Sequence, residues 1–277
     1  MPELPDVEAF RKVLASCAQD AVIRRVDVYD TGVLHDVSAA RLRRELTGRS
    51  FAAPERHGKW LLARTSGDDD ADGSPTVLLH FGMTGRLVCC APGEERHAHD
   101  RVVFTVAPAQ RGRHERELRY RDQRKLKGLW LVDDAGAKRM LADQGPDAAQ
   151  VSQAEFDERL ARRRGGVKSA LTDQSLLAGL GNLLADELLW RARLAPDTPV
   201  GTLTDADRAR LYKEMRSTLK ATVQAGRIPD RATWLTGHRD DDPARCPRCG
   251  TGLRRDRVSG RATVWCPHCQ PRDGKRS

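Results

Sequence analysis

Two pairs of cysteines near the end of the chain have the spacing of a metal site. Cys246 and Cys249 form one C-x2-C pair, and Cys266 and Cys269 form a second pair after 16 intervening residues. Each short turn lets both sulfurs face one ion, and four thiolates complete the tetrahedral coordination of Zn²⁺. Because no coordination position then remains for water or substrate, we expect one zinc ion with a purely structural role.

The segment between the cysteine pairs predicts a small β-hairpin, with strands at residues 254–258 and 262–265 and a turn at Ser259-Gly260. Four arginines on so short a ribbon favour contacts with phosphates. They are Arg254, Arg255, Arg257 and Arg261. By itself, a basic zinc ribbon is equally compatible with a transcription factor or a ribosome-associated protein.

The opposite end of the chain offers a nucleophile. If Met1 is removed, Pro2 presents a secondary amine that is free and conformationally fixed. An α-amino group titrates near pH ~7.7–8.0, so part of it is unprotonated at neutral pH. Such an amine can attack the anomeric carbon of a deoxyribose to give an iminium, and a nearby carboxyl, Glu3 or Asp6, can assist as an acid. As a pattern alone, the segment more often represents the solvated start of a helix.

The composition favours a polyanionic partner. The 277 residues include 48 Lys and Arg against 39 Asp and Glu, which gives a formal net charge of +9. Neutralising phosphates releases condensed counterions, so nucleic acid is the first candidate. The alternative is a soluble protein that is merely rich in arginine.

The sequence also bears on the compartment. No apolar run is long enough for a transmembrane helix, and the N-terminus lacks the basic and apolar regions of a signal peptide. We therefore expect a protein of the cytoplasm or the nucleoid, without a membrane partner. Seven cysteines in such a chain favour metal binding over disulfides, and Cys17, Cys89 and Cys90 are interpreted as small buried hydrophobic residues.

The elements that must position these groups change in type along the chain. Helical spacing at residues 7–18 is followed by short β-rich runs broken by turn residues, which indicate an antiparallel sandwich or barrel. The runs are residues 22–26, 60–63, 77–80, 86–89, 102–106, 117–120 and 129–132. Residues 66–74 are typical of a solvated hairpin loop.

After about residue 136 the pattern becomes helical. Ser152 and Glu155 resemble a capping box, and helices are expected near residues 168–171, 183–190 and 205–224. A polar, Pro-bounded linker is placed at residues 239–243. The chain is thus predicted to be an α+β multidomain protein. Its expected parts are an N-terminal antiparallel β-sandwich with a leading helix (1–135), an α-helical domain (136–238) and a zinc hairpin (239–277).

Six segments in order along the chain resemble the formamidopyrimidine-DNA glycosylase (Fpg/Nei) family. They are PELPDVE at residues 2–8, RHGKWLL at 56–62, HFGMTG at 80–85, RYRDQRK at 119–125, GLGNLLADE at 179–187 and SGRAT at 259–263. The resemblance spans essentially the whole chain. It implies that the helical domain contains a helix–two-turns–helix motif and that the N-terminal domain is catalytic.

The resemblance also implies roles for individual residues. Pro2 matches the Schiff-base nucleophile and Glu3 the general acid, while Lys59 and Arg261 match residues that contact phosphate and assist β- and δ-elimination. Met83 and Arg124 match side chains that enter the space left by a flipped nucleotide. Further DNA contacts are implied for His97, Arg163, Lys168 and Asn182. Each has a structural alternative, such as a surface charge for Lys59, a helix cap for Asn182 or a solvated loop residue for His97.

The implied protein is a monomeric base-excision-repair enzyme that acts on double-stranded damaged DNA. It would remove the damaged base and then cleave the strand by β- and δ-elimination, with structural zinc and no nucleotide cofactor. Two other classes remain open: a non-catalytic protein that binds damaged DNA on the same scaffold, and a zinc-ribbon transcription factor.

The chain departs from the family pattern at several positions. Asp6 stands in place of a glutamate, Leu126 in place of an aromatic wedge residue and Leu184 in place of a tyrosine. Residues 225–245 are also shorter than the loop that closes over the flipped base in members that recognise 8-oxoguanine. We therefore expect a more open pocket that accepts formamidopyrimidines, oxidised pyrimidines or bulky alkylated bases.

Overall fold

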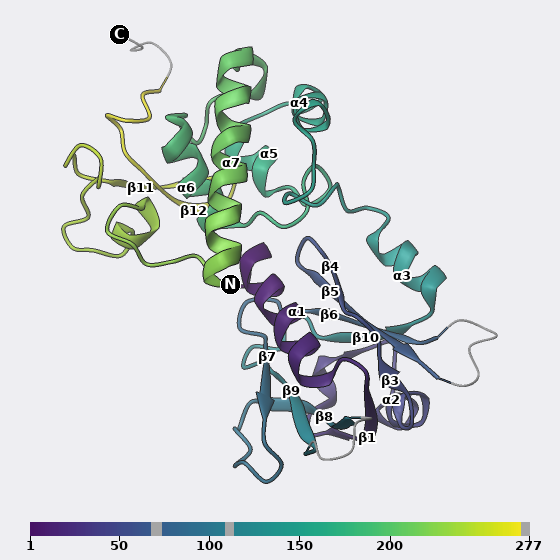
Figure 1. The fold of residues 1–277 in the computed structure, drawn as a ribbon. Helices are drawn as coiled ribbons and strands as arrows, with labels where there is room; N and C mark the ends of the chain where they lie inside the picture. The colour runs from purple at the N-terminus through teal and green to yellow at the C-terminus, as the bar shows by residue number, and fades with distance from the viewer. Residues whose placement is uncertain (68–73, 109–113, 273–277) are drawn as a thin grey trace. The chain divides into compact units, whose positions relative to one another are not determined.

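The computed structural model describes residues 1–67, 74–108 and 114–272, which form two compact units (Figure 1). Unit 1 comprises residues 1–2 and 6–143, and unit 2 comprises residues 3–5 and 144–277. The hairpin loop expected at residues 66–74 falls largely outside the described residues. No helix in the described part of the chain combines the length and apolar character needed to cross a membrane.

Unit 1 contains most of helix α1 (Leu4–Ala18) and ten strands among its described residues. The strands are β1 (Ala21–Val28), β2 (Leu34–His35), β3 (Ser50–Phe51), β4 (Glu55–His57), β5 (Trp60–Ser66), β6 (Thr76–His80), β7 (Arg86–Cys90), β8 (Asp100–Pro108), β9 (Arg116–Arg121) and β10 (Leu129–Val132). Two short helices, α2 (Ala39–Leu46) and α3 (Asp134–Leu141), complete the unit. The sequence patterns predict seven of these strands but neither α2 nor α3 as a separate helix.

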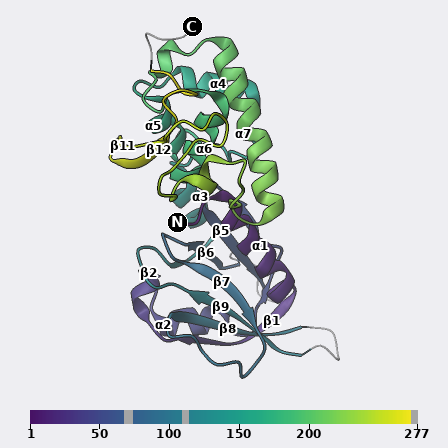
Figure 2. The same cartoon turned by 90° about the vertical axis from the view of Figure 1, so that its left-hand side faces the viewer.

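The strands form the predicted sandwich because β5 takes part in two layers. Its first residues pair with β4 and β6, whereas its last residues, Thr65 and Ser66, pair with β3. In the second layer β1, β8, β9 and β7 follow β3, and β7 to β9 lie side by side in Figure 2. Buried side chains of both layers, such as Phe104 and Leu79, meet in one core. The pairing is antiparallel apart from β2, which runs parallel to β10.

The sequence predicted Cys17 and Cys89 to be small buried hydrophobic residues and favoured no disulfides, and this prediction was wrong for the two cysteines. They are joined by a disulfide, with their Cα atoms 5.9 Å apart, across a sequence separation of 72 residues. Cys17 lies in the last turn of α1 and Cys89 on β7, so only the folded unit brings the two thiols within bonding distance. Cys90 is buried with a free thiol, in agreement with its prediction as a small hydrophobic residue.

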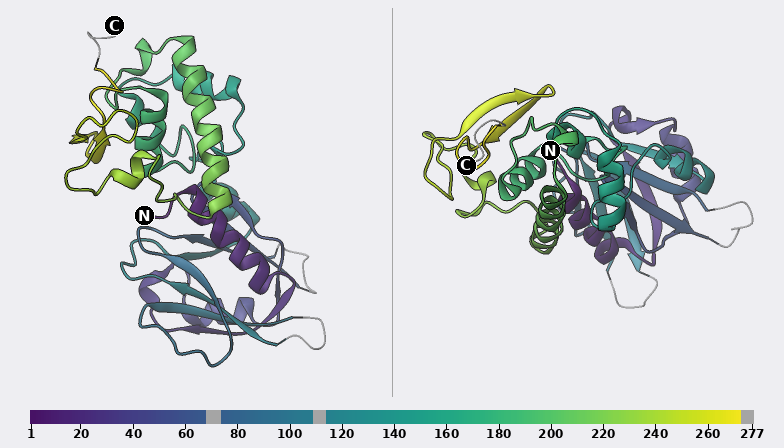
Figure 3. Two further views of the ribbon diagram at one scale, coloured as in Figure 1. Left: turned by 60° about the vertical axis from the view of Figure 1, so that its left-hand side comes forward. Right: turned by 90° about the horizontal axis from the view of Figure 1, so that it is seen from above.

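Unit 2 is helical with one β-hairpin (Figure 3). Its elements are α4 (Gln153–Ala161), α5 (Val167–Thr172), α6 (Asn182–Ala192), α7 (Asp205–Ala225), the 3-10 turns η3 (Val200–Thr202) and η4 (Leu235–His238), and strands β11 (Arg254–Val258) and β12 (Arg261–Trp265). Ser152 caps α4 by accepting the N–H of Glu155, and a complete capping box starts α7 at Thr204 and Asp207. Helix α6 is buried along most of its length and packs against α5, α7 and β12.

Candidate functional site

Glu3 is fully buried, and its carboxylate lies at the N-terminus of α6. One oxygen accepts the N–H groups of Gly181 at 2.8 Å and Leu184 at 3.2 Å, and the other accepts the N–H of Leu183 at 2.9 Å. The first N–H groups of a helix have no partner within the helix and carry its positive dipole end. A carboxylate, which can only accept hydrogen bonds, satisfies all three donors.

Two glycines make room for this contact. A Cβ atom on Gly181 would lie 2.2 Å from Cδ of Glu3, and a Cβ on Gly179 would lie 2.6 Å from Leu4. Gly179 also has a φ of +115°, a backbone conformation that L side chains rarely adopt. The GLG sequence before α6 is therefore required for the chain next to Pro2 to approach the helix end.

Lys59 lies in the turn of a β-hairpin within unit 1. His57 and Trp60 pair across the β4–β5 turn, and Lys59 is half-buried. Arg56 holds this turn by donating to the carbonyl of Gly58 at 3.0 Å and to Glu8 of α1 at 3.1 Å. Burial alone would raise the pKa of the Glu8 carboxyl, but its bonds to Arg11 and Arg56 outweigh burial and leave this pKa lowered.

His80 is a neutral neighbour of Lys59. Burial lowers the pKa of His80 to about 4, and the positive charges of Lys127 and Lys59 add to this shift. Its Nδ1 accepts the N–H of Gly82 at 3.1 Å, so the ring proton lies on Nε2 at neutral pH. The imidazole thus supports the turn that carries Met83 without adding charge.

Met83 and Arg124, predicted to act together, are in contact within unit 1. Arg124 donates from its guanidinium to the sulfur of Met83 at 3.1 Å. Met83 is 41% exposed and Leu126, which stands where an aromatic wedge residue was expected, is 49% exposed. Leu126 lies against Gly82, next to Met83, so the two exposed apolar side chains lie on adjoining turns and form a candidate binding surface.

The four cysteines of the C-terminal module meet in unit 2 as predicted. Their sulfurs lie within 4.8 Å of one another. Three of the separations are 3.4 Å, 3.6 Å and 3.8 Å, close to the edge of about 3.8 Å that a tetrahedron with Zn–S bonds of about 2.3 Å requires. Trp190 donates its indole N–H to the sulfur of Cys246 at 3.3 Å. The donor set fits one structural zinc ion, and the thiolate sulfurs would be its ligands.

Lys168, one of the implied DNA contacts, is buried in unit 2. It is 1% exposed, and its ammonium is 2.6 Å from Asp186 and 2.6 Å from the hydroxyl of Thr263. Asp186, also 1% exposed, further accepts from Arg239 and from the N–H of Val264 at 3.1 Å. Burial lowers the pKa of Lys168 even though Asp186 opposes the shift. In this arrangement Lys168 joins helix α5 to the hairpin, and a direct contact with phosphate stays a prediction.

The hairpin position of Arg261 is fixed through the carbonyl of the next residue. The oxygen of Ala262 accepts from Asn182 at 2.8 Å, from Lys168 at 3.3 Å and from Arg239 at 3.2 Å. These three donors come from α6, α5 and the segment after η4. The side chain of Arg261 itself is exposed, so unit 2 presents a guanidinium on an anchored backbone.

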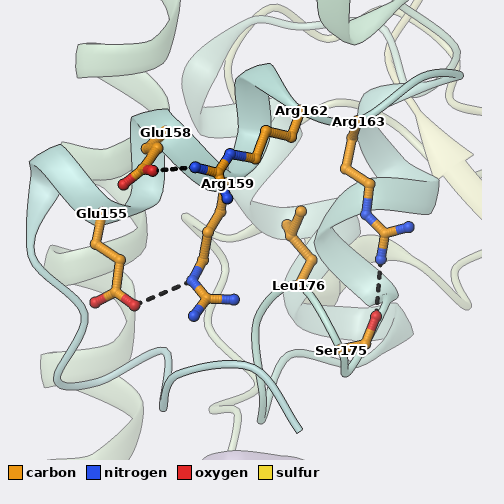
Figure 4. Close-up of a pocket in the computed structure, with 7 residues that line it drawn as sticks. All are labelled: Glu155, Glu158, Arg159, Arg162, Arg163, Ser175 and Leu176. Carbon is orange, nitrogen blue, oxygen red and sulfur yellow. Dashed lines mark hydrogen bonds and ion pairs between the residues drawn. The ribbon is translucent and has the colours of Figure 1, made fainter. Parts of the chain in front are cut away.

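His97 in unit 1 and Arg163 in unit 2 are the remaining predicted DNA contacts. The exposed His97 belongs to a loop held by Asp100, which accepts its backbone N–H at 3.0 Å. Arg163 lines a surface hollow of about 400 Å³, where it bonds Ser175 at 2.8 Å (Figure 4). Its guanidinium also pairs with Asp173. Two other arginines of this hollow are each paired with a glutamate of α4.

Sequence reasoning missed the buried carboxylate of Asp186. One signal for it existed: Asp186 follows Asn182 by four residues, so both lie on the same face of α6. Its partner Arg239 was assigned to a polar, Pro-bounded linker, and its side chain is only 14% exposed. Polar residues within an otherwise apolar helical segment are candidates for such buried networks.

Family models match three consecutive parts of the chain. They are the formamidopyrimidine-DNA glycosylase N-terminal domain at residues 1–129, the formamidopyrimidine-DNA glycosylase H2TH domain at 143–232, and the zinc finger found in FPG and IleRS at 245–272. The chain is 34% identical to a formamidopyrimidine-DNA glycosylase of Symbiobacterium thermophilum, with 98% of this chain and 90% of the relative covered. It is 36% identical to one of Salinispora arenicola, with 98% and 97% covered.

Solved structures are also similar. The Lactococcus lactis formamidopyrimidine-DNA glycosylase bound to DNA with an abasic site matches with a TM-score of 0.81 and 25% identity, covering 98% of this chain and 100% of that one. The same Lactococcus protein in complex with DNA that contains FAPY-dG matches with a TM-score of 0.82 at the same identity and coverage.

Removal of one thiolate should remove the metal. In Cys249→Ala we expect zinc content by elemental analysis to fall well below the one ion per chain of the unaltered protein, because three sulfurs no longer close the tetrahedral site. Binding to duplex DNA should weaken with it, since the hairpin that carries Arg261 loses its anchor. Cys90→Ala, which removes a thiol outside the cluster, is the control and should keep its zinc. Full zinc content in Cys249→Ala would contradict the assignment.

The ion pairs of the buried Asp186 predict an order of stability among variants in denaturant titrations. Asp186→Leu should lower the free energy of unfolding by about 3–5 kcal/mol, because it leaves two buried cations without their counter-charge. Lys168→Met should cost less, since Asp186 keeps Arg239 and the N–H of Val264. Glu158→Gln, which breaks an exposed ion pair, serves as the control and should change little. The reverse order for the two buried variants would refute the central role of Asp186.

Proposed function

Since the chain belongs to the formamidopyrimidine-DNA glycosylase family, we propose that it excises damaged bases from duplex DNA and cleaves the strand at the resulting abasic site. The protein is an Fpg-type DNA glycosylase of DNA repair. The proposal concerns the residues that carry out the reaction, the lyase steps and the class of lesion.

The burial of Glu3 at the end of α6 is the observation on which the proposed chemistry rests. After removal of Met1, the amine of Pro2 would be covalently adjacent to a carboxylate whose position three N–H groups fix. The carboxylate would take a proton from the amine, and the amine would then attack C1′ of the flipped nucleotide. The bond from C1′ to the base breaks as the carboxyl returns this proton to the base. The adduct nitrogen then loses its remaining proton, and the bond from C1′ to the sugar ring oxygen breaks as that oxygen takes up a proton, which leaves an iminium on Pro2.

Elimination would follow from the iminium. Loss of a proton from C2′ expels the 3′ phosphate, and a second elimination expels the 5′ phosphate, which leaves a one-nucleotide gap with phosphates on both ends. Lys59 and Arg261 are the proposed phosphate contacts for these steps. A fixed backbone at each supports this role: Arg56 holds the Lys59 turn, and three donors hold the carbonyl beside Arg261.

The amine can reach C1′ only if the nucleotide leaves the base stack of the duplex, which costs a few kcal/mol. Met83 and Arg124 would occupy the vacated space, Met83 as an adaptable apolar wedge and Arg124 as a donor to the unpaired base. Asn182, Lys168, His97 and Arg163 are the further proposed DNA contacts. For Asn182 and Lys168 this role requires that their bonds to the hairpin be exchanged for phosphate oxygens.

We propose a lesion class other than 8-oxoguanine, because residues 226–238 are few and the part of this segment at Trp234 and Leu235 is buried. Trp234 is 4% exposed beneath the guanidinium of Arg191, at 4.3 Å from the ring centroid. Glu187 accepts the N–H of Thr236 at 3.0 Å, and burial raises the pKa of Glu187 despite its contact with Arg191. A segment held in this way supports an open pocket suited to ring-opened purines, oxidised pyrimidines or bulky alkylated bases.

Borohydride trapping on DNA with an abasic site separates an enzyme from a binding protein. We expect a covalent protein–DNA complex for the mature protein, with mass spectrometry placing the adduct on Pro2. Glu3→Gln should still be trapped on abasic DNA but should lose base excision by about 100-fold or more, because proton transfer is impaired. No trapped complex with the unaltered protein would favour the non-catalytic alternative, whereas full activity with Met1 retained would refute Pro2 as the nucleophile.

A panel of lesion-bearing duplexes tests the proposed specificity. We expect kcat/KM for formamidopyrimidine or an oxidised pyrimidine to exceed that for 8-oxoguanine opposite cytosine by about tenfold. Abasic duplex of the same sequence is the matched control, because its cleavage needs no base recognition. 8-Oxoguanine opposite cytosine as the best substrate would reject the open-pocket proposal while leaving the glycosylase assignment intact.

A further inference from the structure

Two turns of unit 1 carry the exposed side chains at the proposed wedge. The first turn, between β6 and β7, places Met83 at its tip and closes with a 2.8 Å bond from the N–H of Gly85 to the carbonyl of Phe81. The second turn, after β9, places Arg124 at its tip. The two tips lie about 40 residues apart in sequence and meet through the guanidinium–sulfur contact of 3.1 Å.

A buried carboxylate joins the bases of these turns. Asp122 is 1% exposed, and its Oδ1 accepts the hydroxyl of Thr84. The same hydroxyl accepts the backbone N–H of Arg124 at 3.0 Å, and this N–H is also 3.1 Å from Oδ1 of Asp122. Thr84 on one turn is thus bonded to both ends of the Asp122–Arg124 segment on the other. We name Thr84, Asp122 and the N–H of Arg124 the wedge clasp.

The surroundings fix Asp122 in turn. Its N–H donates to the carbonyl of His99 at 3.0 Å, and its own carbonyl accepts from Arg101 at 2.8 Å. Tyr120, which is fully buried, donates its hydroxyl to the carbonyl of His80 at 3.2 Å. Burial raises the pKa of Tyr120, and the negative charge of Asp122 adds to the shift, so the phenol stays protonated as a donor.

We propose that Thr84 and Asp122 are positioning residues that hold Met83 and Arg124 in their inserting arrangement before DNA binds. Neither residue has been assigned a role in the proposed reaction, and the inference rests on that proposed function. A preformed wedge avoids the loss of loop freedom that insertion would otherwise require. The wedge clasp therefore contributes to nucleotide flipping rather than to the bond-breaking steps.

The matched pair Thr84→Val and Thr84→Ser tests the clasp. Valine keeps the shape of threonine but removes the hydroxyl, which eliminates two hydrogen bonds, one of them to a charged group. Serine keeps the hydroxyl. For Thr84→Val we expect base excision from duplex DNA, and affinity for a duplex with a stable abasic analogue, to fall about tenfold. Thr84→Ser should keep the base-excision activity and the duplex affinity of the unaltered protein.

Two readouts distinguish positioning from general damage. Fluorescence of 2-aminopurine placed opposite the abasic analogue should rise on binding of the unaltered protein and of Thr84→Ser, and less for Thr84→Val. Borohydride trapping on single-stranded abasic DNA, which has no stack to open, should be unchanged in all three proteins. Equal loss on single-stranded and duplex substrates, or a valine variant equal to the unaltered protein on duplex, would overturn the proposal.

The outcome also separates this inference from the proposed function. If the unaltered protein gives no trapped complex, the catalytic proposal fails, and the fluorescence comparison on the abasic analogue still decides the clasp. If trapping succeeds and Thr84→Val matches Thr84→Ser in every assay, the glycosylase proposal stands and the clasp is refuted.

Discussion

The contact between the Glu3 carboxylate and the first N–H groups of α6 is the constraint on which the proposed active site depends. It places the residue after Pro2 at a helix end that needs acceptors, so the position of the N-terminal segment follows from satisfying buried donors. The glycines at 179 and 181 are needed because side chains there would overlap with Leu4 and Glu3. The same contact therefore explains why glycine is required at 179 and 181 and how the Glu3 carboxylate is fixed beside Pro2.

Buried carboxylates recur as the supports of the exposed groups. Asp186 in unit 2 and Asp122 in unit 1 are each 1% exposed. Asp122 fixes the turn that presents Arg124, and Asp186 accepts the N–H of Val264 on strand β12, which begins at Arg261. Asp100 acts similarly on the loop of His97, with Arg119 and Arg121 as its cationic partners. A conformation that separates the paired groups would leave a buried charge without a partner, which costs free energy. Such networks therefore hold the attached surface loops in one arrangement.

The sequence predicted the elements well where the signal is local. Alternating runs located β1 and β5 to β10, and helical spacing located α1, α6 and α7 within a few residues. It missed α2, whose stripe of buried leucines is short, and the two-residue strands β2 and β3, which depend on their neighbours. The Cys17–Cys89 disulfide was mispredicted because only the packing of α1 beside β7 brings the two thiols together.

The amino-acid sequence alone determined the zinc ligands, the order of β-rich and helical parts, and the family resemblance that points to Pro2 and Glu3. These follow from spacings of a few residues and from motifs that are continuous in the chain. Only the tertiary structure decided that Lys168 is enclosed by Asp186 and Thr263, and that Thr84 bonds Asp122. Burial and pairing across tens of residues depend on the path of the whole chain, which no local pattern specifies.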